Sequence, residues 1–122
     1  MASQTKARQS AKIKEIAEAL GSVGYRTLDD QAKVLGLCRS TTWTLVKTAH
    51  KASGLSAHLI CRMLASRKLP APVRQKIIEY VDEHLAGLYG HSRPQRRKFA
   101  ARLAANLRSA AADREIRRRA AV

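Results

Sequence analysis

Large aromatic side chains are scarce in this chain, at 4% of 122 residues, with one tryptophan and one phenylalanine. A hydrophobic core therefore has to be built mainly from leucine, isoleucine, valine and alanine, which favours small, closely packed helices. A chain of this length has room for one small domain and a tail, but not for two sizeable cores.

Cysteines and long apolar runs are also scarce. Two cysteines are too few for a disulfide framework. No segment approaches the roughly 20 apolar residues that span a bilayer, and the polar, basic start of the chain does not resemble a signal peptide. We therefore expect a cytoplasmic protein, associated with the nucleoid, that has no membrane partner.

Acidic residues are few: 9 Asp and Glu face 24 Lys and Arg, which gives a formal net charge of +15. Such an excess indicates a polyanionic partner. The sequence shows no phosphate-binding loop, no dinucleotide fingerprint and no nucleophile with a suitably spaced base. We expect a binding protein without a cofactor, and not an enzyme.

Helical periodicity is the main pattern present, because every apolar pattern in the chain has a helical rather than an alternating period. The predicted fold class is all-α: a compact bundle of about five helices containing a helix-turn-helix, with a basic C-terminal helical tail. The expected domain is 1–90 and the tail is 91–122. The longest apolar stripe, expected to close the core, consists of Ile77, Ile78, Val81 and Leu85.

Residues 28–47 are predicted to form two short helices with a glycine turn between them. Thr27 with Asp30 three places later approximates a capping box that starts the first helix, and Gly36 is expected to end it. Leu37 is expected to pack in the corner between the two helices, while the second helix presents a polar and aromatic surface. This arrangement is typical of a helix-turn-helix.

Five residues occupy the first, fifth, ninth, tenth and eighteenth places of a twenty-residue unit: Leu28, Ala32, Gly36, Leu37 and Leu45. With this spacing the segment resembles the DNA-binding helix-turn-helix of the lactose-repressor family and of the wider lambda-repressor-like superfamily. The sequence LPAPVRQKIIEYVDEHLAGLY at 69–89 is similar to the third helix of that family's headpiece, and 50–68 is an additional segment. Cys38 replaces the family's capping serine, and Gln31 and Thr42 occupy places that are usually apolar.

The resemblance implies that three residues of the second helix reach base edges: Arg39, Ser40 and Thr44. An arginine in the major groove can bond O6 and N7 of a guanine; the alternative is that Arg39 contacts only a phosphate. Contacts to DNA phosphates are expected from Arg26, Thr27, Thr41, Lys47 and Lys51. Trp43 either packs over the following helix, which we expect, or stays exposed and touches a sugar or a thymine methyl group.

The tail, residues 91–122, holds ten Lys or Arg against two acids, a net charge of +8. Phe99, Leu103 and Leu107 predict a helix over 95–109. One hypothesis is that the tail contacts phosphates through Arg93, Arg96, Arg97, Lys98 and Arg102. The other is that the three apolar residues form a dimer seam or a contact for a protein partner.

Two further groups of residues are candidates for binding: the basic residues near the start of the chain and four possible metal ligands. Lys6, Arg8, Lys12 and Lys14 lie on the early part of the first predicted helix and either touch phosphates or are solvated. The possible metal ligands match no zinc module by their spacing, so no metal site is expected at His58, Cys61, Cys38 and His50.

We therefore expect a sequence-specific transcriptional regulator that binds double-stranded DNA, as a homodimer on a two-fold-related site. The alternatives are a nonspecific or architectural nucleic-acid-binding protein and a protein-interaction adaptor built on the same fold.

Overall fold

The computed structural model describes residues 2–47 and 54–120, which form six α-helices and no strand. The all-helical prediction is therefore confirmed for this part of the chain. In chain order the helices are α1 (Ala2–Ser22), α2 (Leu28–Leu35), α3 (Arg39–Val46), α4 (Ala57–Ala65), α5 (Ala71–Leu85) and α6 (Arg93–Ala120). None of these helices combines the length and the apolar character needed to cross a membrane.

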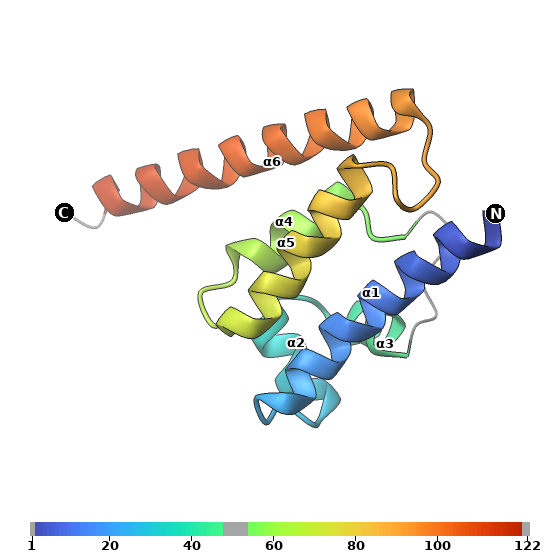
Figure 1. Ribbon diagram of the computed structural model, residues 1–122. Coiled ribbons are helices and arrows are strands. Elements are labelled where there is room, and N and C mark those ends of the chain that lie inside the picture. Colours follow the sequence, from blue (N-terminus) through green and yellow to red (C-terminus); the bar gives the residue numbers. More distant parts are fainter. Residues whose placement is uncertain (1, 48–53, 121–122) are drawn as a thin grey trace.

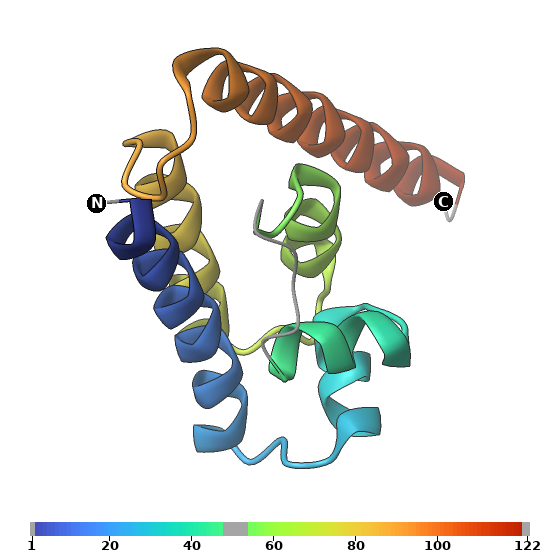
Figure 2. The same ribbon diagram turned by 90° about the vertical axis from the view of Figure 1, so that its right-hand side faces the viewer.

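The helices pack in three neighbouring groups (Figures 1 and 2). The long helices α1 and α5 lie side by side, α2 and α3 form a second unit beside the lower half of α1, and α6 crosses the opposite end of the molecule. Helix α4 contacts both α2 and α6, so it lies between these two parts of the fold.

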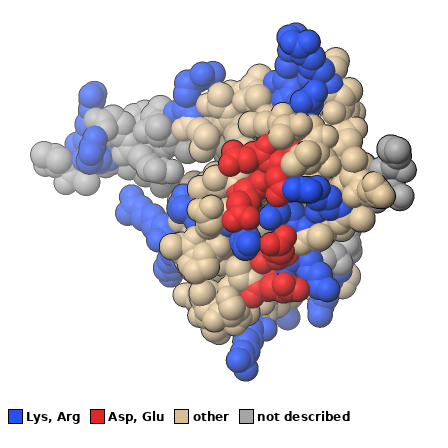
Figure 3. Space-filling view, in the orientation of Figure 1, with Lys and Arg blue, Asp and Glu red and all other residues tan. Residues whose placement is uncertain are grey.

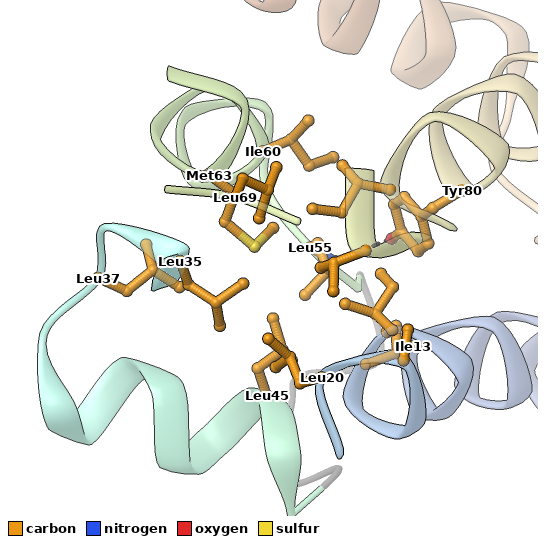
Figure 4. Close-up of a cluster of buried hydrophobic side chains, with 14 of the residues drawn as sticks. Ile13, Leu20, Leu35, Leu37, Leu45, Leu55, Ile60, Met63, Leu69 and Tyr80 are labelled. Carbon is orange, nitrogen blue, oxygen red and sulfur yellow. Dashed lines mark hydrogen bonds between the residues drawn. The ribbon is translucent and has the colours of Figure 1, made fainter. Parts of the chain in front are cut away.

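The five helices from α1 through α5 share one continuous core, and each of them contributes side chains to it (Figure 4). Its fully buried aliphatic residues include Ile13 and Leu20 of α1, Leu35 of α2 and Leu45 of α3. Burying a side chain of this size stabilises the fold by roughly 1.5–3 kcal/mol. The core is thus mainly aliphatic, as the scarcity of aromatic residues predicts, but Tyr80, Tyr89 and Phe99 are also buried in it.

The buried face of α5 differs from the predicted stripe. Ile77 is buried, but Ile78 is 39% exposed and Leu85 is 38% exposed. The residues that α5 does bury are Val73, Ile77, Tyr80 and His84. The predicted stripe was therefore right for Ile77 and for Val81, which is packed against the core, and wrong for Ile78 and Leu85. It counted only aliphatic residues, whereas Tyr80 is held inside by a hydrogen bond: the Leu55 amide donates to its hydroxyl at 2.9 Å.

Helix α6 begins two residues earlier than predicted and extends well beyond Ser109, to Ala120. Its start is a reciprocal capping box: the Gln95 amide donates to the Ser92 hydroxyl, and the Ser92 amide donates to the Gln95 side-chain oxygen. Phe99 is buried in the common core and Leu103 is packed against it. Leu107 is 41% exposed and does not share this contact. The three apolar residues are therefore not all packed against the core in the same way.

Candidate nucleic-acid interface

The turn between α2 and α3 fixes the direction of α3. Gly36 ends α2 with the left-handed backbone φ of 71°, and its amide bonds back to the last turn of α2. A side chain at this position would be strained by that φ, and its Cβ would lie 3.4 Å from Ser66 Cβ of the chain that follows α4. Leu37 is buried next to it. The predicted stop at Gly36 and the predicted burial of Leu37 are both confirmed.

The start of α2 is also as predicted. Thr27 is the N-cap residue, and its hydroxyl accepts a hydrogen bond from the Asp30 amide at 3.2 Å. By contrast, Cys38 is the N-cap residue of α3 but its side chain makes no capping hydrogen bond. The substitution of a thiol for a good capping group therefore leaves the first turn of α3 less stabilised than that of α2.

The two polar residues at usually apolar places are buried and bonded. Gln31 donates a side-chain hydrogen bond to the Tyr25 carbonyl at 2.9 Å, and the Thr42 hydroxyl donates to the Cys38 carbonyl at 2.9 Å. Their polar groups are satisfied locally, so they do not impose the cost of an unpaired buried group. With Leu45 they anchor the inner faces of α2 and α3.

The three predicted base-contact residues lie together on the outer side of α3. Arg39 and Ser40 are exposed, Thr44 is half-buried, and all three line a shallow hollow together with Leu28, Cys38 and Trp43. The Thr44 hydroxyl donates to the Ser40 carbonyl at 3.1 Å, which sets its rotamer. Arg39 lies 3.5 Å from Asp29, but both side chains are about two-thirds exposed or more, at 71% and 68%. Such a pair is weak and is readily exchanged for a contact with a stronger anion.

Trp43 is 48% exposed beside these residues. The expectation that its ring packs over the next helix was wrong, because the buried positions of α3 are those of Thr42 and Leu45 and Trp43 faces the other way. The single tryptophan is thus part of the same surface as Arg39 and Thr44.

The Cys38 thiol lies at the start of this surface. Its sulfur is hydrogen-bonded to the Ser40 hydroxyl at 3.4 Å and to the Thr41 hydroxyl at 3.0 Å, and these bonds lower the pKa of Cys38 to about 7. Thr41, expected at a phosphate, instead directs its hydroxyl to this sulfur.

The other residues expected at phosphates lie around the ends of the two helices. Arg26 and Thr27 are exposed at the start of α2, and Lys47 is exposed at the end of α3. Lys51 lies outside the described residues. Arg26, Thr27 and Lys47 therefore flank the α2–α3 unit at its surface.

The predicted tail residues form a separate surface. Arg93, Arg97, Lys98 and Arg102 are exposed on α6, which lies on the far side of α4 from α2 (Figure 2). Arg96 differs: it is half-buried and donates to the Leu85 carbonyl at 3.2 Å, so it fastens α6 to the end of α5.

The basic residues early in α1 have partners within the protein. Lys12 reaches Glu79 at 3.0 Å, Glu83 at 3.2 Å and Glu15 at 3.3 Å, and Arg8 bonds Glu83 at 2.6 Å. Figure 3 shows the acidic side chains gathered on this face of the molecule, with Lys and Arg among them. The sequence predicted either phosphate contacts or a solvated surface for Arg8 and Lys12. The structure shows ion pairs within the protein instead.

The possible metal ligands are dispersed. Cys61 is buried, with its thiol directed to the Leu103 carbonyl at 3.6 Å, whereas His58 and Cys38 are exposed elsewhere. His50 lies outside the described residues. Within the described ranges no three His, Cys, Asp or Glu residues are grouped as metal ligands would be.

Two long stretches of the sequence contain basic residues but no acidic ones, and they include α3, α4 and most of α6. Residues 31–78, which include α3 and α4, contain nine Lys or Arg and no Asp or Glu. Residues 84–112, which include most of α6, also lack acids. The surfaces on α3, α4 and α6 therefore carry positive charge with few acids nearby to neutralise it.

Comparison of the chain with models of known protein families gave no match, and neither did comparison with curated proteins or with solved structures.

Proposed function

We propose that this protein is a sequence-specific transcriptional regulator that binds double-stranded DNA, with α2 and α3 acting as a helix-turn-helix. The observation that carries the proposal is the row of outward-facing side chains on α3, whose opposite side is anchored by Thr42 and Leu45. A helix held rigidly on one side and polar on the other can enter the major groove of DNA.

Each residue of the row has a defined task in this proposal. Arg39 exchanges its exposed contact with Asp29 for the O6 and N7 atoms of a guanine. Ser40 and Thr44 offer hydroxyl groups to neighbouring bases, and Trp43 contacts a sugar or the methyl group of a thymine. Arg26, Thr27 and Lys47 position the unit on the phosphates, which supplies affinity but no sequence preference.

A homodimer fits this mode of binding, because two copies of α3 can then read two half-sites one helical turn apart. Dimerisation doubles the number of base contacts and makes the preferred site two-fold symmetric. The symmetry of selected DNA sequences therefore reports on the oligomeric state.

A nonspecific or architectural role in nucleic-acid binding is the second candidate. It is favoured by the first part of α6, residues 93–112, which contains no acid and could follow a phosphate backbone without reading bases. In that case the α3 row would contribute only phosphate contacts.

Selection of bound sequences from a random pool of double-stranded DNA, at two salt concentrations, tests the proposal. We expect a shared motif that persists at the higher salt. Salt-sensitive binding without a motif would support the nonspecific role, and no binding at all would contradict both and leave a protein-interaction adaptor.

A further inference from the structure

A second candidate site lies away from α3, where α4 begins, α5 ends and α6 passes over both. It is a pocket of about 280 Å³ that shares no residue with the hollow beside α3. Its volume is several times the roughly 30 Å³ that one water molecule occupies in the liquid, so it accommodates more than a single small ion.

Two cations stand at the pocket, Lys98 and Arg102 of α6. They are one helical turn apart, which places both on the same side of α6. No acidic residue lines the pocket, and the stretch 84–112 around them contains none. The potential inside is therefore positive, and the pocket favours an anion.

The first turn of α4 adds backbone donors. Ser56 is its N-cap residue and lines the pocket with Ala57. The Ser56 hydroxyl accepts from the Leu59 amide and its carbonyl from the Ile60 amide, which leaves the earlier amides of this turn for an external acceptor. The positive end of the helix dipole points the same way.

A buried polar side chain in the wall points independently to a ligand. His84 is 3% exposed and lines the pocket, and its Nδ1 atom makes no hydrogen bond to another residue, although a hydrogen bond with its own backbone acts to raise the pKa of the ring. Buried polar groups in folded proteins are nearly always bonded to protein or to water, so an unpaired one in the wall of a pocket leaves a place for a polar partner. Burial, together with the nearby His91, lowers the pKa of His84 to about 4, so a neutral ring is available there at neutral pH.

The remaining wall is aromatic and rigid. The rings of His91 and Phe99 stack on His84, with centroids 4.2 Å and 3.9 Å from its own. This stack joins the end of α5, the following linker and α6. Aromatic rings in the wall beside two cations suit a ligand with both an anionic group and an organic part.

We propose that this pocket binds an organic phosphate monoester, with the phosphate between Lys98, Arg102 and the first turn of α4, and with His84 bonding the ligand from the wall. The phosphate belongs either to a free nucleotide or to the 5′ end of a nucleic-acid strand, since the chemistry is the same. The proposal does not depend on DNA binding by α3.

The test uses the full chain and AMP as the probe, with adenosine as the ligand that lacks the phosphate. Isothermal titration calorimetry is expected to show AMP binding at least tenfold tighter than adenosine. The double substitution Lys98→Gln with Arg102→Gln is expected to weaken AMP binding at least tenfold. The matched control, Arg93→Gln with Arg97→Gln, removes two charges from the same helix outside the pocket and is expected to change it by less than about twofold.

Two results would overturn the proposal: equal binding of AMP and adenosine, or equal losses in the two double variants, which would mean diffuse charge attraction. The NMR signals of the His84 ring provide a second readout, since AMP is expected to shift them and unchanged signals would place the ligand elsewhere. Wild-type binding of a 5′-phosphorylated and a 5′-hydroxyl trinucleotide then separates the two sources. A preference for the phosphorylated strand supports the site as a strand-end site, and AMP binding without that preference supports it as a nucleotide site.

Discussion

Helices α1 and α6 are the two long, basic helices of the protein, and they are held in different ways. Helix α1 is held by aliphatic residues and by ion pairs to acids of α5, centred on Lys12. The first part of α6 has no acid near it in sequence and is held by Phe99, Leu103 and the Arg96 contact. The charge of α1 is thus partly neutralised within the fold, whereas Arg93, Arg97, Lys98 and Arg102 on the first part of α6 are exposed.

The largest expected effect tests whether α6 belongs to the same folding unit as α1. Phe99→Ala removes the aromatic ring that joins α6 to the core and is expected to lower the free energy of unfolding by about 3 kcal/mol. Leu107→Ala on the exposed side of α6 is the control, with an expected loss below about 1 kcal/mol. Urea unfolding of both variants measures this difference. Equal, small losses would show that α6 is only loosely attached.

The next effect tests the ion-paired attachment of α1. Lys12 is only 12% exposed, and its removal takes the shared cation from Glu79 and Glu83, which keep only their ion pairs with Lys76 and Arg8. Lys12→Met is expected to cost about 1–3 kcal/mol of unfolding free energy, less than a fully buried pair would. Lys14→Met, at an exposed position on the same helix, is expected to be nearly neutral. If the two substitutions have the same effect, the ion pairs do not stabilise the contact of α1 with α5.

Acid is expected to destabilise the protein in two separate pH windows. Burial lowers the pKa of His84 to about 4 from 6.5, so the unfolded state binds a proton that the folded state excludes, and stability falls as the pH drops from about 6.5 to about 4. Hydrogen bonds from Lys76 and Lys12 lower the pKa of Glu15, and one from Lys12 lowers that of Glu79. Their contribution is complete above about pH 4.5 and is lost as the pH falls through the lowered values.

Thermal unfolding across this pH range, with two variants, separates the windows. His84→Phe is expected to flatten the upper window and Lys12→Met the lower one. A wild-type melting temperature that stays constant from pH 6.5 to 4 would contradict the burial of a neutral His84.

The smallest effect concerns the charge of α6. If Arg93 and Arg97 contact phosphates, replacing both by Gln reduces the slope of log affinity against log salt by up to about 0.9 for each contact. Replacing Arg8 and Lys14 of α1 removes the same charge and is expected to leave the slope unchanged. Fluorescence anisotropy with labelled DNA at several salt concentrations measures both. Equal slopes for all three proteins would exclude α6 from the DNA contact.

Local signals explain which parts of the fold were predictable. Thr27 and Gly36 set the ends of α2 through their own side chain or backbone, so their neighbours in sequence were sufficient. The α5 face was not predictable by the same means, because burial of Tyr80 and His84 depends on partners far along the chain: Leu55 for Tyr80 and Phe99 for His84.

The candidate interface shows the same division. Arg39, Ser40 and Thr44 could be grouped because they share one side of one helix. The exposure of Trp43 depends on how α3 rotates against α1 and α2, which its own sequence does not specify. The pocket beside α4 was missed, because it joins His84 to Ser56 and Lys98 from three distant segments. One signal in the sequence could have located the start of α6: the capping pair Ser92 and Gln95.

The central claim is that α3 reads bases, and one measurement tests it directly: the affinity of Arg39→Ala for the selected DNA site and for random DNA at the same salt concentration. We expect a loss of about 1–3 kcal/mol on the selected site and a much smaller loss on random DNA. Arg62→Ala, an exposed arginine of α4, is the control and is expected to affect both DNAs alike. An equal loss on both DNAs for Arg39→Ala would reduce Arg39 to a phosphate contact and would contradict base reading by this residue.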